Sequence, residues 1–199
     1  AELIEQIGAG IEALRVLWGQ LAMVLVRSDL DKVDELAERF IRLAANAKLT
    51  NGPYTGHRIL GYAALMRGNI SRSRRYFDSA MREFEQESRF VFDDSPFDLY
   101  SMCLAQDVLV LQQEGFLDRA ARQADKALAE ARRINSPPSE GYVLVHLALA
   151  YMISGDVQRV SVYTDALREL IARSDLGYFR WHSEALLGWA KGKAGALEE

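Results

Sequence analysis

A turn signature recurs along the chain at nearly constant spacing, and this repeat register limits the possible folds more than any other feature. Each occurrence has a small residue, then a polar or other turn residue, then an apolar residue. The five occurrences are Ser28-Asp29-Leu30, Gly68-Asn69-Ile70, Gly115-Phe116-Leu117, Gly155-Asp156-Val157 and Gly195-Ala196-Leu197, and their first residues lie 40, 47, 40 and 40 residues apart. Glycine favours the left-handed conformation that ends a helix, and asparagine or aspartate caps the next one. The register therefore predicts repeated helix pairs.

The segments between these turns have helical periodicity. From Leu117 to Ile134, apolar residues recur at spacings of three and four, and charged residues fill the opposite face, which is typical of an amphipathic helix. Val, Ile and Thr do not gather into the runs that strands require. We therefore predict an all-α fold, a right-handed α-solenoid of helix pairs in a single domain over residues 1–199. The expected pairs span about 5–47, 54–88, 97–134 and 138–173, and a ninth, capping helix spans about 178–194.

Small and apolar residues keep a fixed distance from the turns. A small residue, which lets a partner helix approach closely, stands seven positions before three of them: Gly61, Ala148 and Gly188. An apolar or small residue stands twelve positions after four of them: Phe40, Ala80, Ala127 and Leu167. We expect the first set at the contact between paired helices and the second set on the helix that follows each turn. The longer spacing between the second and third turns matches a loop over residues 88–96, in which Phe90, Val91 and Phe92 are expected to form an apolar lid on the stack.

These positions resemble those of a tetratricopeptide repeat. The matching residues are Leu60-Gly61, Ala64, Gly68-Asn69, Phe77 and Ala80, and again Gly115, Ala120, Ala124 and Ala127. A tetratricopeptide repeat has about 34 residues, and the longer period here is similar to the helical-repeat region of bacterial signal-transducing, STAND-type ATPases. In that group the repeats follow an NTPase module. The resemblance runs from Trp18 to Gly195 and is closest from Asp98 onward.

The sequence departs from the family pattern in its first two pairs. Ser73 replaces the usual alanine in the second pair, and the first pair has Ser28 in place of glycine and Leu21 in place of a small residue. The first pair is therefore expected to be an atypical, capping unit.

The resemblance implies a non-enzymatic role. It suggests a protein-interaction or effector-sensing domain of a larger bacterial transcriptional regulator of the LuxR-type, maltose-regulator-like or winged-helix kind. NTPase, DNA-binding and cyclase chemistry would lie outside the domain. A scaffold domain of an ATPase-linked adenylate or guanylate cyclase, and a homodimerisation module, are alternatives that the residues leave open. Both ends look like cuts through a longer protein, and without a signal peptide pattern we expect a cytoplasmic location.

Composition argues against several other classes of function. The chain has 24 Lys and Arg and 28 Asp and Glu, a net charge of −4, which does not favour direct nucleic-acid binding. Cys103 is the single cysteine, which excludes an internal disulfide and a multi-cysteine zinc site. The apolar stretch from Val16 to Val26 is shorter than the ~20 residues that span a membrane, so no membrane partner is expected.

No residue pattern predicts catalysis, a metal site or a cofactor. None of the three histidines lies in an HxxxH or HExxH motif, and Cys103 has no His or Lys one helical turn away to activate it. The segment Gly188–Ala194 is one residue short of a phosphate loop and lacks its final Ser or Thr. Asp98 follows an acidic loop without the ligand pattern of an EF-hand, so we expect it to cap a helix.

The concave face of such a stack is the predicted binding site, because the first helices of the pairs line it. Register with the tetratricopeptide pattern places eleven residues there: Trp18, Arg58, Tyr62, Met66, Leu109, Gln112, Tyr142, Leu149, Met152, His182 and Trp189. This set is aromatic, Met-rich and sparsely charged, which is typical of surfaces that bind apolar peptides, helices or small amphipathic effectors. The alternative is that these side chains only pack against neighbouring helices.

A basic cluster near the second turn is the other candidate surface. Its members are Arg67, Arg72, Arg74 and Arg75. Such a cluster is either a solvated face or a surface for an acidic partner or for the neighbouring ATPase module.

Overall fold

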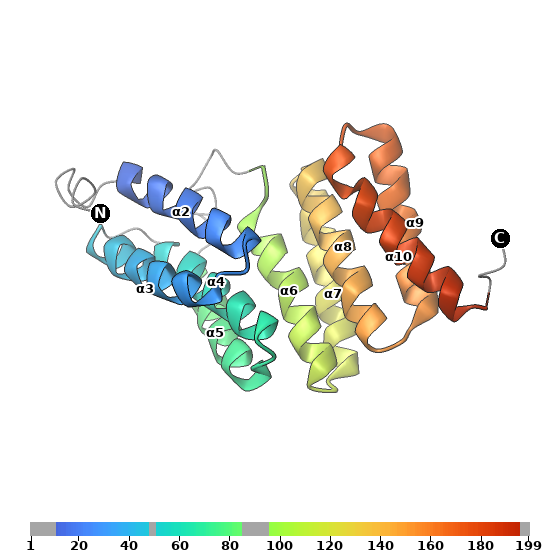
Figure 1. Ribbon diagram of the computed structural model, residues 1–199, viewed down its shortest axis with the longest axis horizontal. Helices are drawn as coiled ribbons and strands as arrows, with labels where there is room; N and C mark the ends of the chain where they lie inside the picture. The colour runs from blue at the N-terminus through green and yellow to red at the C-terminus, as the bar shows by residue number, and fades with distance from the viewer. Residues whose placement is uncertain (1–10, 48–50, 85–95, 196–199) are drawn as a thin grey trace. The chain divides into compact units, whose positions relative to one another are not determined.

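The computed structural model describes residues 11–47, 51–84 and 96–195. Within these ranges every regular element is a helix and none is a strand, which confirms the all-α prediction. Nine α-helices and one short 3-10 helix follow one another in this part of the chain (Figure 1): α2 (Ile11–Val26), α3 (Leu30–Asn46), α4 (Gly52–Met66), α5 (Ile70–Glu83), α6 (Leu99–Gln113), α7 (Leu117–Arg133), α8 (Pro137–Ile153), α9 (Val157–Arg173), η2 (Gly177–Phe179) and α10 (Arg180–Lys193). None of these helices is long and apolar enough to span a membrane.

The chain divides into two compact units, Ala1–Asp94 and Ser95–Glu199. The division falls in the longer connection that the repeat register places between the second and third turns. In the first unit α3 packs on α2 and α4, and α4 packs on α5. In the second unit α8 is central and packs on α6, α7, α9 and α10. The single repeat domain stays a prediction, and the proposed lid residues Phe90, Val91 and Phe92 lie outside the described residues.

The five turns of the repeat register share one backbone conformation. Their first residues all have positive φ, as follows: Ser28 56°, Gly68 73°, Gly115 80°, Gly155 74° and Gly195 78°. At the first four turns the next residue donates its backbone N–H to the carbonyl five residues back, at 2.9 to 3.0 Å, the bond that defines a Schellman helix end. The side chains of Asp29, Asn69 and Asp156 then cap the following helix. The predicted helix–turn–helix pairs are confirmed at the first four turns.

The contact between paired helices follows the predicted spacing. The four residues twelve positions after the turns are all fully buried: Phe40, Ala80, Ala127 and Leu167. Before the turns, Ala148 is also fully buried, and a Cβ added at Gly61 would lie only 3.3 Å from the ring of Phe77. Gly188 differs, because it is exposed and a Cβ there would meet no atom of the described residues within 4 Å. No second helix of the described chain packs at that position.

Helix α5 shows how one departure from the family pattern is accommodated and where one predicted boundary fails. Ser73 is fully buried, and its hydroxyl donates a 2.8 Å hydrogen bond to the carbonyl of Gly61 in α4, so the serine takes the place of alanine without an unpaired polar atom. The helix ends at Glu83, not near residue 88 as predicted. Phe84 has an extended backbone, and the centroid of its ring lies 5.1 Å from the centroid of the Tyr54 ring in α4.

The second unit is built around α8, and this arrangement positions the candidate site. In Figure 1, α6, α8 and α10 lie nearer the viewer than α7 and α9, so the first helices of the two pairs and the capping helix α10 form one row of the unit, and the second helices form the other. A core cluster joins α8, α9 and η2: Leu144, Val145, Leu167, Leu170 and Phe179. Gly141 leaves room for the Phe179 ring, which a Cβ would approach to 2.7 Å.

Candidate functional site

Three of the eleven predicted groove residues lie together in one apolar pocket between α8 and α10. Leu149 and Met152 come from α8 and His182 comes from α10. The pocket has a volume of about 150 Å³, and the residues that complete it are Val145, Ala185 and Leu186. On each helix the lining residues are three or four positions apart, so they share one helical face. The repeat register assigned Leu149, Met152 and His182 to the predicted binding face, and it did not single out the three completing residues.

His182 provides the one polar side chain among the residues that line this pocket. Its ring lies 5.4 Å from that of Tyr178 and 6.1 Å from that of Phe179, between ring centroids. The Nδ1 atom is buried and has no hydrogen-bond partner among the residues that the structure describes. Leaving a buried polar atom unpaired costs about 1–3 kcal/mol. The pocket is therefore lined by apolar side chains and by the imidazole of His182, whose Nδ1 is buried and unpaired.

In the first unit the structure brings Trp18 of α2 and Arg58 of α4 together. The guanidinium carbon of Arg58 lies 5.8 Å from the centroid of the Trp18 ring, within the range of a cation–π contact. Arg58 is buried and Trp18 is half-buried, so this pair joins two helices rather than lining an open surface. Further along α4, Tyr62 is half-buried and Met66 is exposed.

The other predicted groove residues of the second unit are partly or wholly packed inside it. Tyr142 accepts a 2.7 Å hydrogen bond from the amide of Gln106 and stacks on His146 at 3.9 Å between ring centroids. Leu109 and Gln112 are buried, and Trp189 is half-buried. For Tyr142 the packing alternative describes the structure better than an open binding face does.

The basic cluster of the first unit is partly neutralised by α3. Arg67 lies 3.1 Å from both Asp31 and Asp34, and Arg72 lies 3.3 Å from Asp34. Arg72 also donates to the hydroxyl of Tyr76 at 3.3 Å, and this hydrogen bond raises the pKa of Arg72 above its usual value. These contacts join the second helix of one pair to the turn of the next.

The remaining two arginines of the cluster differ in exposure. The side chain of Arg74 is mostly buried, and its guanidinium lies 3.9 Å from Asp78 one helical turn away. Arg75 is exposed. Binding of an acidic partner to this cluster stays a prediction.

The titratable side chains that could hold a metal are dispersed. His57 Nδ1 lies 2.6 Å from Glu83, and His146 Nδ1 lies 2.9 Å from the carbonyl of Tyr142. Within the ranges that the structure describes, no three His, Cys, Asp or Glu side chains lie close enough to bind a metal together. Cys103 is fully buried.

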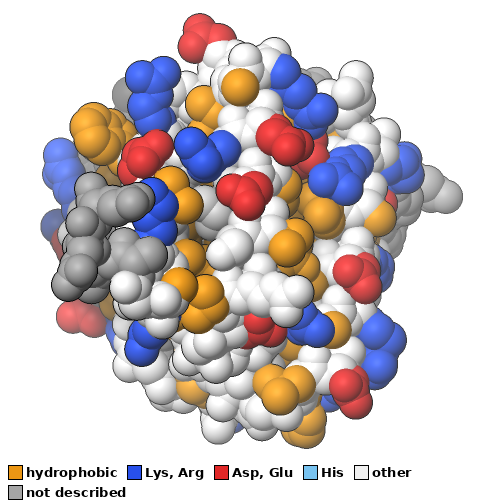
Figure 2. All heavy atoms as spheres, turned by 90° about the vertical axis from the view of Figure 1, so that its right-hand side faces the viewer, with side chains coloured by type: hydrophobic (Ala, Val, Ile, Leu, Met, Phe, Trp, Pro, Cys, Tyr) orange, Lys and Arg blue, Asp and Glu red, His pale blue; other side chains and the backbone are white. Residues whose placement is uncertain are grey.

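Figure 2 shows the side of the molecule on which α9 and α10 lie. Lys and Arg side chains alternate there with Asp and Glu, and the apolar side chains form small separate groups. This face therefore carries both signs of charge rather than one continuous basic surface.

Comparison of this chain with protein-family models, curated proteins and solved structures gave no match in any of the three. The family resemblance of the sequence therefore stays a prediction.

Proposed function

We propose that this chain is a protein-interaction or effector-sensing domain, without enzymatic activity, of a larger bacterial signal-transducing transcriptional regulator. In this proposal the helix pairs form a right-handed tetratricopeptide-like solenoid, and the row of first helices faces the ligand. The observation that carries the proposal is the pocket between α8 and α10, because three residues assigned to the binding face by the repeat register line it together.

The size of the pocket favours a peptide anchor over a large effector. Sites for drug-sized ligands measure about 300–1,000 Å³, whereas this pocket measures about 150 Å³. Apolar cavities of about 150 Å³ accept a benzene-sized group, so one Leu, Met or Phe side chain would fill it. Such a pattern is how an amphipathic helix or peptide docks into a groove.

Binding there would act on how helix α8 and the capping helix α10 sit relative to one another. A ligand held by both α8 and α10 favours the arrangement of these helices that it fits best. If an attached output module shares that equilibrium, occupancy shifts the module between an inactive and an active state.

Filling the pocket tests this proposal. Ala185 is exposed on the pocket wall, so Ala185→Leu should occupy the pocket without removing core contacts. We expect peptides with Leu, Met or Phe anchors, selected from an array and measured by fluorescence polarisation, to bind Ala185→Leu at least about tenfold more weakly. Ala129→Leu, at an exposed alanine of α7, is the matched control and should bind normally. Failure of every peptide to bind the native chain, or equal binding by Ala185→Leu, would contradict the proposal.

The homodimerisation alternative is favoured by one specific observation. Trp181 in α10 is 80% exposed, and Tyr178 in η2, three residues earlier in the chain, is 70% exposed. Large aromatic side chains are enriched at protein interfaces. Sedimentation velocity at high protein concentration distinguishes this alternative: a dimer lost in Trp181→Ala supports it, and a monomer at all concentrations rejects it.

A further inference from the structure

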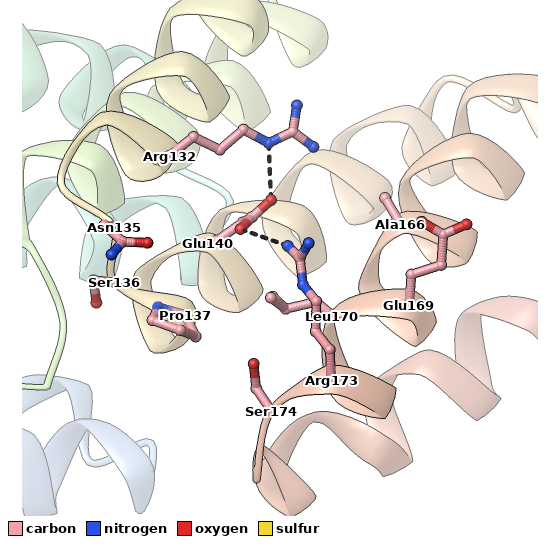
Figure 3. A pocket seen from close by; sticks show the side chains of 10 residues that line it. All are labelled: Arg132, Asn135, Ser136, Pro137, Glu140, Ala166, Glu169, Leu170, Arg173 and Ser174. Carbon is pink, nitrogen blue, oxygen red and sulfur yellow. Dashed lines mark hydrogen bonds and ion pairs between the residues drawn. The ribbon is translucent and has the colours of Figure 1, made fainter.

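A second and larger pocket of the second unit is polar and lies away from the apolar one. It has a volume of about 540 Å³, is open to solvent, and is lined by the end of α7, the start of α8 and the end of α9. Figure 3 shows its side chains from close by. The residues on which the argument rests are Arg132, Asn135, Glu140, Glu169, Arg173 and Ser174.

Glu140 accepts hydrogen bonds from two arginines that belong to different helices. Its carboxylate accepts a 2.8 Å hydrogen bond from Nε of Arg132 and a 3.4 Å hydrogen bond from a terminal nitrogen of Arg173. The Glu140 side chain is only 10% exposed, whereas those of Arg132 and Arg173 are 55% and 66% exposed. A carboxylate buried to this degree needs such partners. Glu140 thereby holds both guanidinium groups at the pocket.

Most donors of these two arginines are left for another acceptor. Arg132 uses Nε for Glu140, and Figure 3 shows its two terminal nitrogens directed away from that carboxylate. Arg173 uses a single terminal nitrogen. No other acceptor for either guanidinium occurs within the described ranges. A guanidinium fork of this kind matches the geometry of a carboxylate or phosphate.

The pocket also carries an acidic group that is not engaged. Glu169 is exposed in α9 and lines the pocket, and it forms no hydrogen bond or ion pair with the residues that the structure describes. Arg132 and Arg173 together balance Glu140 and Glu169, so the formal charge of the four groups is zero. A simple anion would meet the repulsion of Glu169, whereas a ligand with both charges would engage both kinds of group.

We propose that this pocket binds a small zwitterion with a carboxylate and an ammonium group, such as a free amino acid or a short peptide. Arg132 and Arg173 bind the carboxylate, and Glu169 binds the ammonium. Asn135 and Ser174 supply neutral hydrogen-bonding groups on the pocket wall. The volume of about 540 Å³ lies within the range of small-molecule sites. This site is independent of the apolar pocket and of the function proposed for it.

Isothermal titration of the whole chain with glycine, diglycine and triglycine tests the proposal, because these zwitterions differ in the separation of their charges. We expect at least one to bind, and its N-acetyl and its amide derivatives to bind at least about tenfold more weakly. The comparison among the three separates an amino-acid site from a peptide site. Inorganic phosphate is the control for a site that binds any oxyanion.

Variants assign the roles of two of the charged residues, Arg173 and Glu169. Arg173→Gln should weaken the bound zwitterion at least about tenfold, and Glu169→Gln should remove the preference for the zwitterion over its N-acetyl derivative. Both side chains are exposed, so the fold should be retained. Arg168→Gln on the same helix, whose side chain pairs with Asp165 outside the pocket, is the matched control. Binding of no zwitterion at about 10 mM, tighter binding of phosphate than of any zwitterion, or unchanged binding by both variants would overturn the proposal.

Discussion

Ser28 begins the first turn of the repeat register. It is the one first residue among the five turns that has a Cβ atom and still adopts the backbone conformation that favours glycine. Its φ of 56° lies with those of the four glycines at the other turns. The hydrogen bond from Asp29 N–H to the carbonyl of Val24, 3.0 Å long, closes the same type of helix end. The left-handed conformation costs an L-residue roughly 1–2 kcal/mol, so the first turn holds strain that the others avoid.

Relief of this strain gives a prediction at the residue scale. Ser28→Gly should raise the free energy of unfolding by about 0.5–1 kcal/mol, because the relief exceeds the added entropy of glycine in the unfolded chain. Urea denaturation followed by circular dichroism measures the change. Gly155→Ser at the equivalent turn is the converse variant and should lower stability by a similar amount. A loss of stability in Ser28→Gly would show that the first turn is not strained.

At the scale of the helix, two glycines that lower helix propensity equally differ in how tightly they are packed. Gly141 lies inside α8 against Phe179, and Gly188 lies inside α10 with open space around it. Glycine in a helix interior is about 1 kcal/mol less favourable than alanine. Helix propensity alone therefore predicts that alanine would raise stability equally at both positions. The packing predicts opposite effects, because a Cβ has room at Gly188 and none at Gly141.

Gly188→Ala should raise the melting temperature, since nothing opposes the gain in helix propensity of up to about 1 kcal/mol. Gly141→Ala should lower it, because the new Cβ would lie 2.7 Å from the Phe179 ring and would force it out of the core cluster. Thermal unfolding of both variants beside the native chain measures the two signs. Equal stabilisation by both substitutions would mean that Phe179 moves aside at no cost.

At the scale of the whole molecule, the second unit contains its own core and both pockets. The core cluster around Phe179, the apolar pocket and the polar pocket are all formed by residues after Ser95. A unit of about 100 residues is of typical domain size. A fragment of residues 95–199 should therefore be helical and unfold cooperatively, as measured by circular dichroism. An unfolded fragment would show that this core depends on the first unit.

Local signals in the sequence were enough to predict the helices and the turns between them, and three residues assigned to the predicted binding face also line the apolar pocket. A left-handed turn, a helix cap and a spacing of three or four residues each involve only a few neighbouring residues, so Gly68, Asn69 and Phe77 could be assigned from the chain alone. The repeat register also placed Leu149, Met152 and His182 on related helix faces. The register assigned one set of positions per helix, and so Val145, Ala185 and Leu186 were not singled out.

What the sequence by itself determined is the succession of helix pairs, because each turn and each buried stripe is encoded within one repeat. Only the tertiary structure decided where space and charge remain. Arg132, Glu140 and Arg173 belong to three different helices and form no motif, so their meeting depends on how those helices pack. The same holds for the open space at Gly188, where the spacing predicted a close neighbour and none lies within the described chain. A pocket is the space that packed side chains leave, and this is a property of the assembled helices rather than of any one of them.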